Sequence, residues 1–128
     1  MIITEVMYDP ATTGVDNKYE WFELYNPTNS TIDISGWRVE EEQTQPSPQY
    51  YVFASGTVIA PGQTLLVVND TASFNIEFPG IVPDIDMDGT GCYSSTACLR
   101  FNNGSSATHV DYLKLSNSSG VEQDYVGW

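Results

Sequence analysis

The most informative segment of the chain reads Glu20-Trp21-Phe22-Glu23-Leu24-Tyr25-Asn26-Pro27, and Asp33-Ile34-Ser35-Gly36-Trp37 follows shortly after it. In an extended chain successive side chains point to opposite sides, so Phe22 and Leu24 share one face of a strand. The Asn-Pro turn and the Gly-Trp corner separate this strand from its neighbours. Short strands with such punctuation are typical of a small β-sandwich.

The rest of the chain continues in the same way, with turn residues between short apolar or alternating runs. The run 64–69 is the most strand-like and is expected at the buried centre. Phe74, Phe78 and Ile81 fall in a segment that we expect to be irregular, and no helix is predicted. Strands are predicted at 2–8, 21–25, 32–34, 37–39, 50–53, 57–59, 64–69, 97–101, 111–115 and 122–126. The fold class is therefore all-β: a two-sheet antiparallel β-sandwich of about nine strands, in a single domain over residues 1–128.

The charge of the chain argues against two classes of partner. Four Lys and Arg residues stand against 17 Asp and Glu residues, which gives a net charge of −13. Such a field repels phosphate backbones and anionic lipid headgroups, so neither nucleic acid nor a membrane surface is an expected partner. No apolar run reaches the length of a membrane span. The many neutral polar residues suit a secreted or cell-surface location, with any export signal outside these residues.

The two cysteines of the chain, Cys92 and Cys98, lie close enough in sequence to form a disulfide that closes a small loop. The alternative is a pair of half-buried thiols in a reducing compartment. A disulfide would agree with the expected location outside the cell.

The segment Asp84-Ile85-Asp86-Met87-Asp88-Gly89-Thr90 places three carboxylates at alternate positions ahead of a glycine. A tight loop of this kind can fold its acids around a calcium ion, and we predict Asp84, Asp86, Asp88 and the Thr90 carbonyl as ligands. Ser95 occupies the position where a helix–loop–helix calcium site has its glutamate, so further ligands would come from elsewhere. The alternative is a solvated acidic loop whose aspartates cap turns.

Two other groups of residues could be interpreted as a cation site or a catalytic site, but both have simpler explanations. Asp9, Asp16 and Glu20 bracket the first long loop and could hold a cation, but we expect the aspartates to shape turns and Glu20 to accept backbone hydrogen bonds. His109 is the only histidine and has serines nearby, yet no nucleophile elbow or oxyanion loop accompanies it. No catalytic residue is predicted, and the chain is not expected to be an enzyme.

Trp21 and Tyr25 share the strand face opposite Phe22 and Leu24. If that face is open, the rings form a platform for a sugar polymer or a protein partner. The alternative is that loops fold over the rings and bury them.

In their order along nearly the whole chain, these segments resemble the lamin-tail domain, an immunoglobulin-like module that closes nuclear lamins and also occurs in secreted or surface proteins of bacteria and archaea. The prokaryotic branch is the more similar. The residues that carry the resemblance are 3–6, Asp9-Pro10, 20–26, Gly36-Trp37, 51–53, 61–63, 113–115, Gly120 and 124–126. The segment 83–106 departs from the usual pattern, because it is longer and holds the acids and both cysteines.

The resemblance implies an immunoglobulin-like sandwich that serves as a non-catalytic binding or display module, attached to flanking domains of a larger exported protein. It names no ligand, and the expected partner is a protein or a polysaccharide at the cell surface. A spacer domain without a ligand is the structural alternative, and a polysaccharide-binding module is a further one. The DNA and chromatin contacts linked to animal lamins do not agree with the charge of −13.

Overall fold

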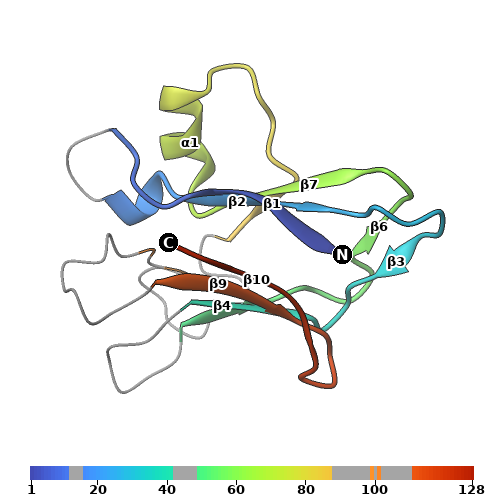
Figure 1. Ribbon diagram of the computed structural model, residues 1–128. Helices are drawn as coiled ribbons and strands as arrows, with labels where there is room; N and C mark the ends of the chain where they lie inside the picture. The colour runs from blue at the N-terminus through green and yellow to red at the C-terminus, as the bar shows by residue number, and fades with distance from the viewer. Residues whose placement is uncertain (12–15, 42–48, 88–98, 100, 102–110) are drawn as a thin grey trace.

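The protein is a sandwich of two four-stranded sheets (Figure 1). The computed structural model describes residues 1–11, 16–41, 49–87, 99, 101 and 111–128. The first sheet has the order β1 (Ile2–Met7), β2 (Trp21–Tyr25), β7 (Thr64–Val68), β8 (Ile85–Asp86), and the second β10 (Glu122–Gly127), β9 (Tyr112–Ser116), β4 (Arg38–Glu41), β5 (Tyr50–Val52). A small third sheet pairs β3 (Ile32–Asp33) with β6 (Val58–Ile59). The predicted all-β, two-sheet sandwich is confirmed.

The core lies between the two sheets and is built from the inward side chains of their strands. In β2 the fully buried Phe22 and Leu24 alternate with half-buried neighbours, as the sequence pattern predicts. Burying a Phe or Leu side chain contributes about 1.5–3 kcal/mol, so these two residues alone fix which face of β2 turns inward. The facing and neighbouring strands add Val39, Tyr51, Ile59, Leu65, Val67, Leu113 and Leu115.

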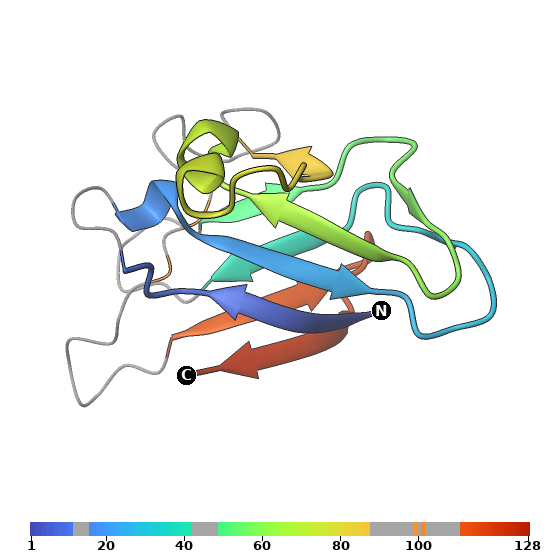
Figure 2. The same cartoon turned by 90° about the horizontal axis from the view of Figure 1, so that it is seen from above.

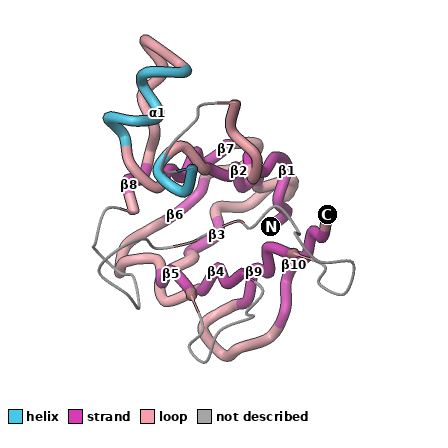
Figure 3. The backbone as a smooth tube through the Cα atoms, turned by 90° about the vertical axis from the view of Figure 1, so that its left-hand side faces the viewer, coloured by secondary structure: helices cyan, strands magenta, loops and turns pink. Residues whose placement is uncertain are grey.

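The prediction that the chain has no helix was wrong. A short 3-10 helix spans Asp16–Lys18, and α1 spans Thr71–Glu77 in the segment that was expected to be irregular. Asp70 caps α1, because its Oδ1 accepts a hydrogen bond of 2.7 Å from the backbone N–H of Ser73. Figure 3 shows α1 on the outer side of the first sheet, away from the second.

One strand pair is parallel and departs from the antiparallel expectation. β8 runs alongside β7, with Val67 opposite Ile85 and Val68 opposite Asp86. Parallel neighbours need a long crossover connection, and here the connection between the two strands contains α1. The helix α1 and the parallel pairing of β7 with β8 therefore both result from one crossover connection.

The two sheets come together along one side of the sandwich, where the edge strands β1 and β10 lie next to each other (Figures 1 and 2). The backbone N–H of Ile3 in β1 donates a hydrogen bond of 2.7 Å to Oδ2 of Asp124 in β10. This side-chain bond satisfies a backbone donor at the edge of the first sheet.

Of the predicted strand at 97–101, only Leu99 and Phe101 are described; both are buried and neither is in a strand. In the part of the chain that the structure covers, no helix is long and apolar enough to cross a membrane.

Candidate functional site

The two described aspartates of the predicted calcium loop bind backbone amides. Oδ2 of Asp84 accepts a hydrogen bond of 2.8 Å from the N–H of Leu66 in β7. Oδ2 of Asp86 accepts one of 3.0 Å from the N–H of Thr71, at the start of α1. Asp84 and Asp86 therefore tie β8 to the strand and to the helix beside it.

The remaining residues predicted for this loop, Asp88, Thr90, Cys92 and Cys98, lie outside the described residues. The calcium site and the disulfide therefore stay predictions. Within the ranges that the structure covers, no group of three or more His, Cys, Asp or Glu side chains is placed to hold a metal ion. His109 also lies outside these ranges.

Glu20 is a buried structural carboxylate, with 2% of its surface exposed. Its Oε2 accepts a hydrogen bond of 3.0 Å from the backbone N–H of Phe101 and one of 3.3 Å from the side-chain amide of Asn69. The same Asn69 nitrogen lies 2.6 Å from the carbonyl oxygen of Asn17 and 3.1 Å from that of Leu99. The expectation that Glu20 accepts backbone hydrogen bonds is confirmed. Asp9 is exposed, and the side chain of Asp16 is not described.

The face that carries Trp21 is covered. The ring centroids of Phe74 and Phe78 lie 6.2 and 5.8 Å from that of Trp21, both in an edge-to-face arrangement. Phe74 and Phe78 are four residues apart, so α1 presents both rings to the sheet. The two alternatives for this strand face were that it is open or that it is covered, and at Trp21 it is covered.

The outer face of the second sheet is different, because none of the described helices and strands lies on it (Figures 1 and 3). Four residues from its four strands stand directly opposite one another and form a row, which we call the cross-strand row. Its members, from β5 to β10, are Tyr50, Glu40, Lys114 and Tyr125. Adjacent strands are about 4.8 Å apart, so the row spans about 14 Å.

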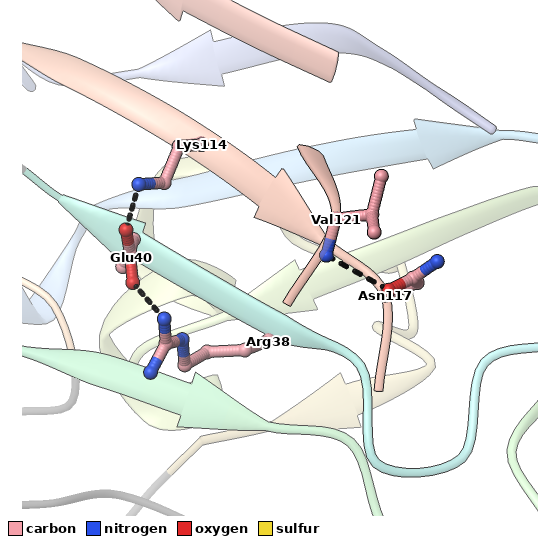
Figure 4. A network of polar contacts seen from close by, with 5 residues as sticks. All are labelled: Arg38, Glu40, Lys114, Asn117 and Val121. Carbon is pink, nitrogen blue, oxygen red and sulfur yellow. Dashed lines mark hydrogen bonds and ion pairs between the residues drawn. The ribbon is translucent and has the colours of Figure 1, made fainter. Parts of the chain in front are cut away.

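An ion-pair network holds the centre of this row (Figure 4). Oε2 of Glu40 lies 2.8 Å from Nη2 of Arg38, and Oε1 of Glu40 pairs with Nζ of Lys114. The bond to Glu40 is the main reason why the pKa of Lys114 is raised above its usual value. The guanidinium of Arg38 also lies over the ring of Tyr50, 5.2 Å from its centroid. Both cations are therefore held in fixed positions on the sheet.

Tyrosine rings extend the row at β10. Tyr125 is 47% exposed, and its ring centroid lies 5.2 Å from that of Tyr112 on β9. Gly127 makes room for this ring, since a Cβ atom at position 127 would stand only 3.2 Å from the Tyr125 hydroxyl. The ring therefore lies along the strand instead of projecting from it.

The turn between β9 and β10 sets the register that places Tyr125 opposite Lys114. Oδ1 of Asn117 accepts hydrogen bonds from the backbone N–H groups of Ser119 and Val121, at 3.0 and 2.9 Å. Figure 4 shows the bond from Val121. Gly120 has a φ of +79°, a conformation that glycine adopts without strain. The turn lies between the strands predicted at 111–115 and 122–126, but the row was not predicted, because cross-strand partners depend on register.

The charges of the side chains described on this outer face cancel. Arg38 and Lys114 carry two positive charges, and Glu40 and Glu122 carry two negative ones. The chain as a whole has a net charge of −13. This face is therefore locally neutral on a strongly anionic molecule.

Comparison with known families finds one that covers the chain. The model of the lamin tail domain family matches residues 1–128. A comparison with curated proteins finds no match.

Proposed function

The chain belongs to the lamin tail domain family, and from this premise we propose that it is a non-catalytic binding module of a larger exported protein, located outside the cell or at its surface. The immunoglobulin-like sandwich is a scaffold, and such folds take their functions from sites on their surfaces. The question is then which surface binds.

The contrast between the two outer faces supports the proposal. The first sheet is covered by α1, whose Phe74 packs on Trp21. The second sheet exposes Tyr125, which packs against the Tyr112 ring, and the Arg38 side chain, which is 41% exposed and is held in place by Glu40. Exposed aromatic and arginine side chains with fixed positions are typical of binding surfaces.

Calcium at the acidic loop is the second part of the proposal. The alternating aspartates from Asp84 onward support it, since a carboxylate has two oxygens and about four acceptor sites. The bonds from Asp84 and Asp86 to backbone amides therefore leave capacity for an ion. Extracellular calcium is plentiful enough to fill weak sites.

The test of the binding role measures how much of the purified chain is retained on intact cells and isolated envelopes of the organism that carries the gene. Two variants, Lys114→Glu and Tyr125→Ala, alter the outer face of the second sheet. Lys18→Glu is the matched control, because Lys18 is exposed and lies in the 3-10 helix, away from this face. Thermal melts of all three confirm that the variants are folded.

We expect the wild-type chain and Lys18→Glu to be retained, and both face variants to be washed off. A ligand-free spacer domain would give no retention of the wild-type chain. That result, or equal retention of all the variants, would overturn the binding role.

A further inference from the structure

We propose that the outer face of the second sheet binds a neutral polysaccharide across its strands, along the row from Tyr50 to Tyr125. This inference rests on the proposed binding function and names the ligand class for it. It is carried by three features of the row: its rings, its fixed polar groups and its lack of net charge.

The rings provide the apolar contact that a sugar chain needs. A pyranose ring presents C–H groups on its faces, and these pack on an aromatic ring that lies flat against a protein surface. Tyr125 lies along β10 over Gly127 and beside the Tyr112 ring. Tyr50 stands at the other end of the row, under the Arg38 guanidinium. A chain of sugars that crosses the strands over about 14 Å would meet the Tyr125 ring at one end and the Arg38 guanidinium stacked on Tyr50 at the other.

The ion-pair network between the rings provides hydrogen-bonding groups for sugar hydroxyls. A hydroxyl is both a donor and an acceptor, so it can bind an ammonium, a guanidinium or a carboxylate. Lys114 and Arg38 are pinned by Glu40, whose own side chain is only 13% exposed. Groups that are already ordered lose little side-chain entropy when a ligand binds.

The charge balance favours a neutral polymer over an anionic one. The four charged side chains that the structure describes on this face sum to zero, whereas the chain carries −13. A carboxylated or phosphorylated polymer would be repelled by the surrounding field without a compensating positive patch. A neutral polymer is not repelled by this field.

The same row is poorly suited to a protein partner. The core of a protein interface is depleted in charged residues and has a contiguous apolar centre. Here the charged groups occupy the centre, and the rings lie at the two ends. This order is the reverse of what a protein interface requires.

The experiment is native electrophoresis of the 128-residue chain in gels that contain one dissolved polysaccharide each. The neutral probes are hydroxyethyl cellulose, mixed-linkage β-glucan, xylan and galactomannan, and the carboxylated probes are alginate and pectate. Tyr125→Ala is compared with Tyr125→Phe, which keeps the ring. Tyr8→Ala is the matched control, because Tyr8 is exposed to a similar extent, 37% against 47%, but does not belong to this face.

We expect at least one neutral polymer to retard the wild-type chain, Tyr125→Phe and Tyr8→Ala. Tyr125→Ala should bind at least about fivefold more weakly, as expected for truncating an exposed aromatic contact of a binding surface. Retardation only by alginate or pectate, or equal binding by Tyr125→Ala, would overturn the inference. If no neutral polymer binds while the chain is still retained on envelopes through this face, the ligand class is wrong and the binding function stands. If neither assay shows binding, both fail.

Discussion

Glu20 shows how a charged residue at the start of the most informative segment acts in the fold. Its carboxylate lies between the backbone N–H of Phe101 and the amide of Asn69, and it is almost fully buried. A buried donor that loses its partner costs about 1–3 kcal/mol, and more when the lost partner is charged. The Glu20 carboxylate therefore links the start of β2 to a distant part of the chain. It does not serve as a solvated surface charge.

We predict that Glu20→Ala lowers the free energy of unfolding by about 1–3 kcal/mol, because it leaves the buried N–H of Phe101 without an acceptor. The amide of Asn69 keeps its bonds to the carbonyl oxygens of Asn17 and Leu99. Urea denaturation followed by circular dichroism measures the change. Glu5→Gln is the control, since Glu5 is exposed on the edge strand β1 and its substitution should change stability by less than about 0.5 kcal/mol. Equal losses in the two variants would contradict the structural role of Glu20.

Sequence reasoning succeeded for Glu20 and failed for Glu40 for a physical reason. Glu20 precedes an alternating strand next to a predicted loop, where backbone donors without partners are expected. Glu40 lies just beyond the strand predicted at 37–39, yet in the structure it belongs to β4 and lies between two cations. Its partners come from Arg38, two positions before it, and from Lys114 on β9. Only the pairing of β4 with β9 brings Lys114 close.

The helix α1 is an element that local sequence could have revealed. Asp70 is a good N-cap residue, and Phe74 and Phe78 have the four-residue spacing of one helical face. Asn75, Ile76 and the following Pro-Gly hid this signal, because they favour irregular structure in so short a segment. The strands were easier to predict, since each runs over several alternating or apolar residues. The parallel pairing of β7 with β8 could not be predicted, because it depends on the helix between them.

We predict that Asp70→Ala destabilises α1 by about 1 kcal/mol, because the N–H of Ser73 loses its cap. Hydrogen exchange measured by NMR should be faster at the amides of Phe74 and Phe78, which close the helical turns. Asp70→Asn keeps an acceptor at the same place and should leave exchange nearly unchanged at neutral pH. Slow exchange in both variants would show that packing on Trp21 alone holds the helix.

The cap also makes α1 sensitive to acid. Partial burial by itself would raise the pKa of Asp70, but the hydrogen bonds from Ser73 and the charge of Lys18 outweigh it and lower the pKa. A lowered pKa in the folded state means that the stabilisation is fully present above the unfolded value of about 3.9. It is lost as the pH falls through the lower folded value. The protection factor of the Phe78 amide, which corrects the exchange rate for its intrinsic pH dependence, should therefore fall below about pH 4 in the wild-type chain, with the part due to the cap absent in Asp70→Asn.

The net charge of −13 is a property of the whole molecule, and it complicates any test of the proposed calcium site. Seventeen acids against four bases repel one another in the compact state, so any salt that screens them should raise the melting temperature. A rise on adding calcium is therefore not evidence of a site by itself. Specific binding has to be separated from screening at constant ionic strength.

Calcium at about 5 mM should raise the melting temperature by about 5 °C over a chelated sample at equal ionic strength, while magnesium and sodium should not. The reason is that an ion bound only by the folded state stabilises by about 1.4 kcal/mol at ten times its dissociation constant. Asp88→Asn should abolish the shift, because Asp88 is a predicted ligand, and the matched Asp9→Asn should keep it. The outcome depends on Asp84 and Asp86, which already bind the amides of Leu66 and Thr71. If these bonds satisfy the two carboxylates fully, calcium and magnesium will act alike, and the acidic loop is a clamp between β8 and its neighbours instead of a metal site.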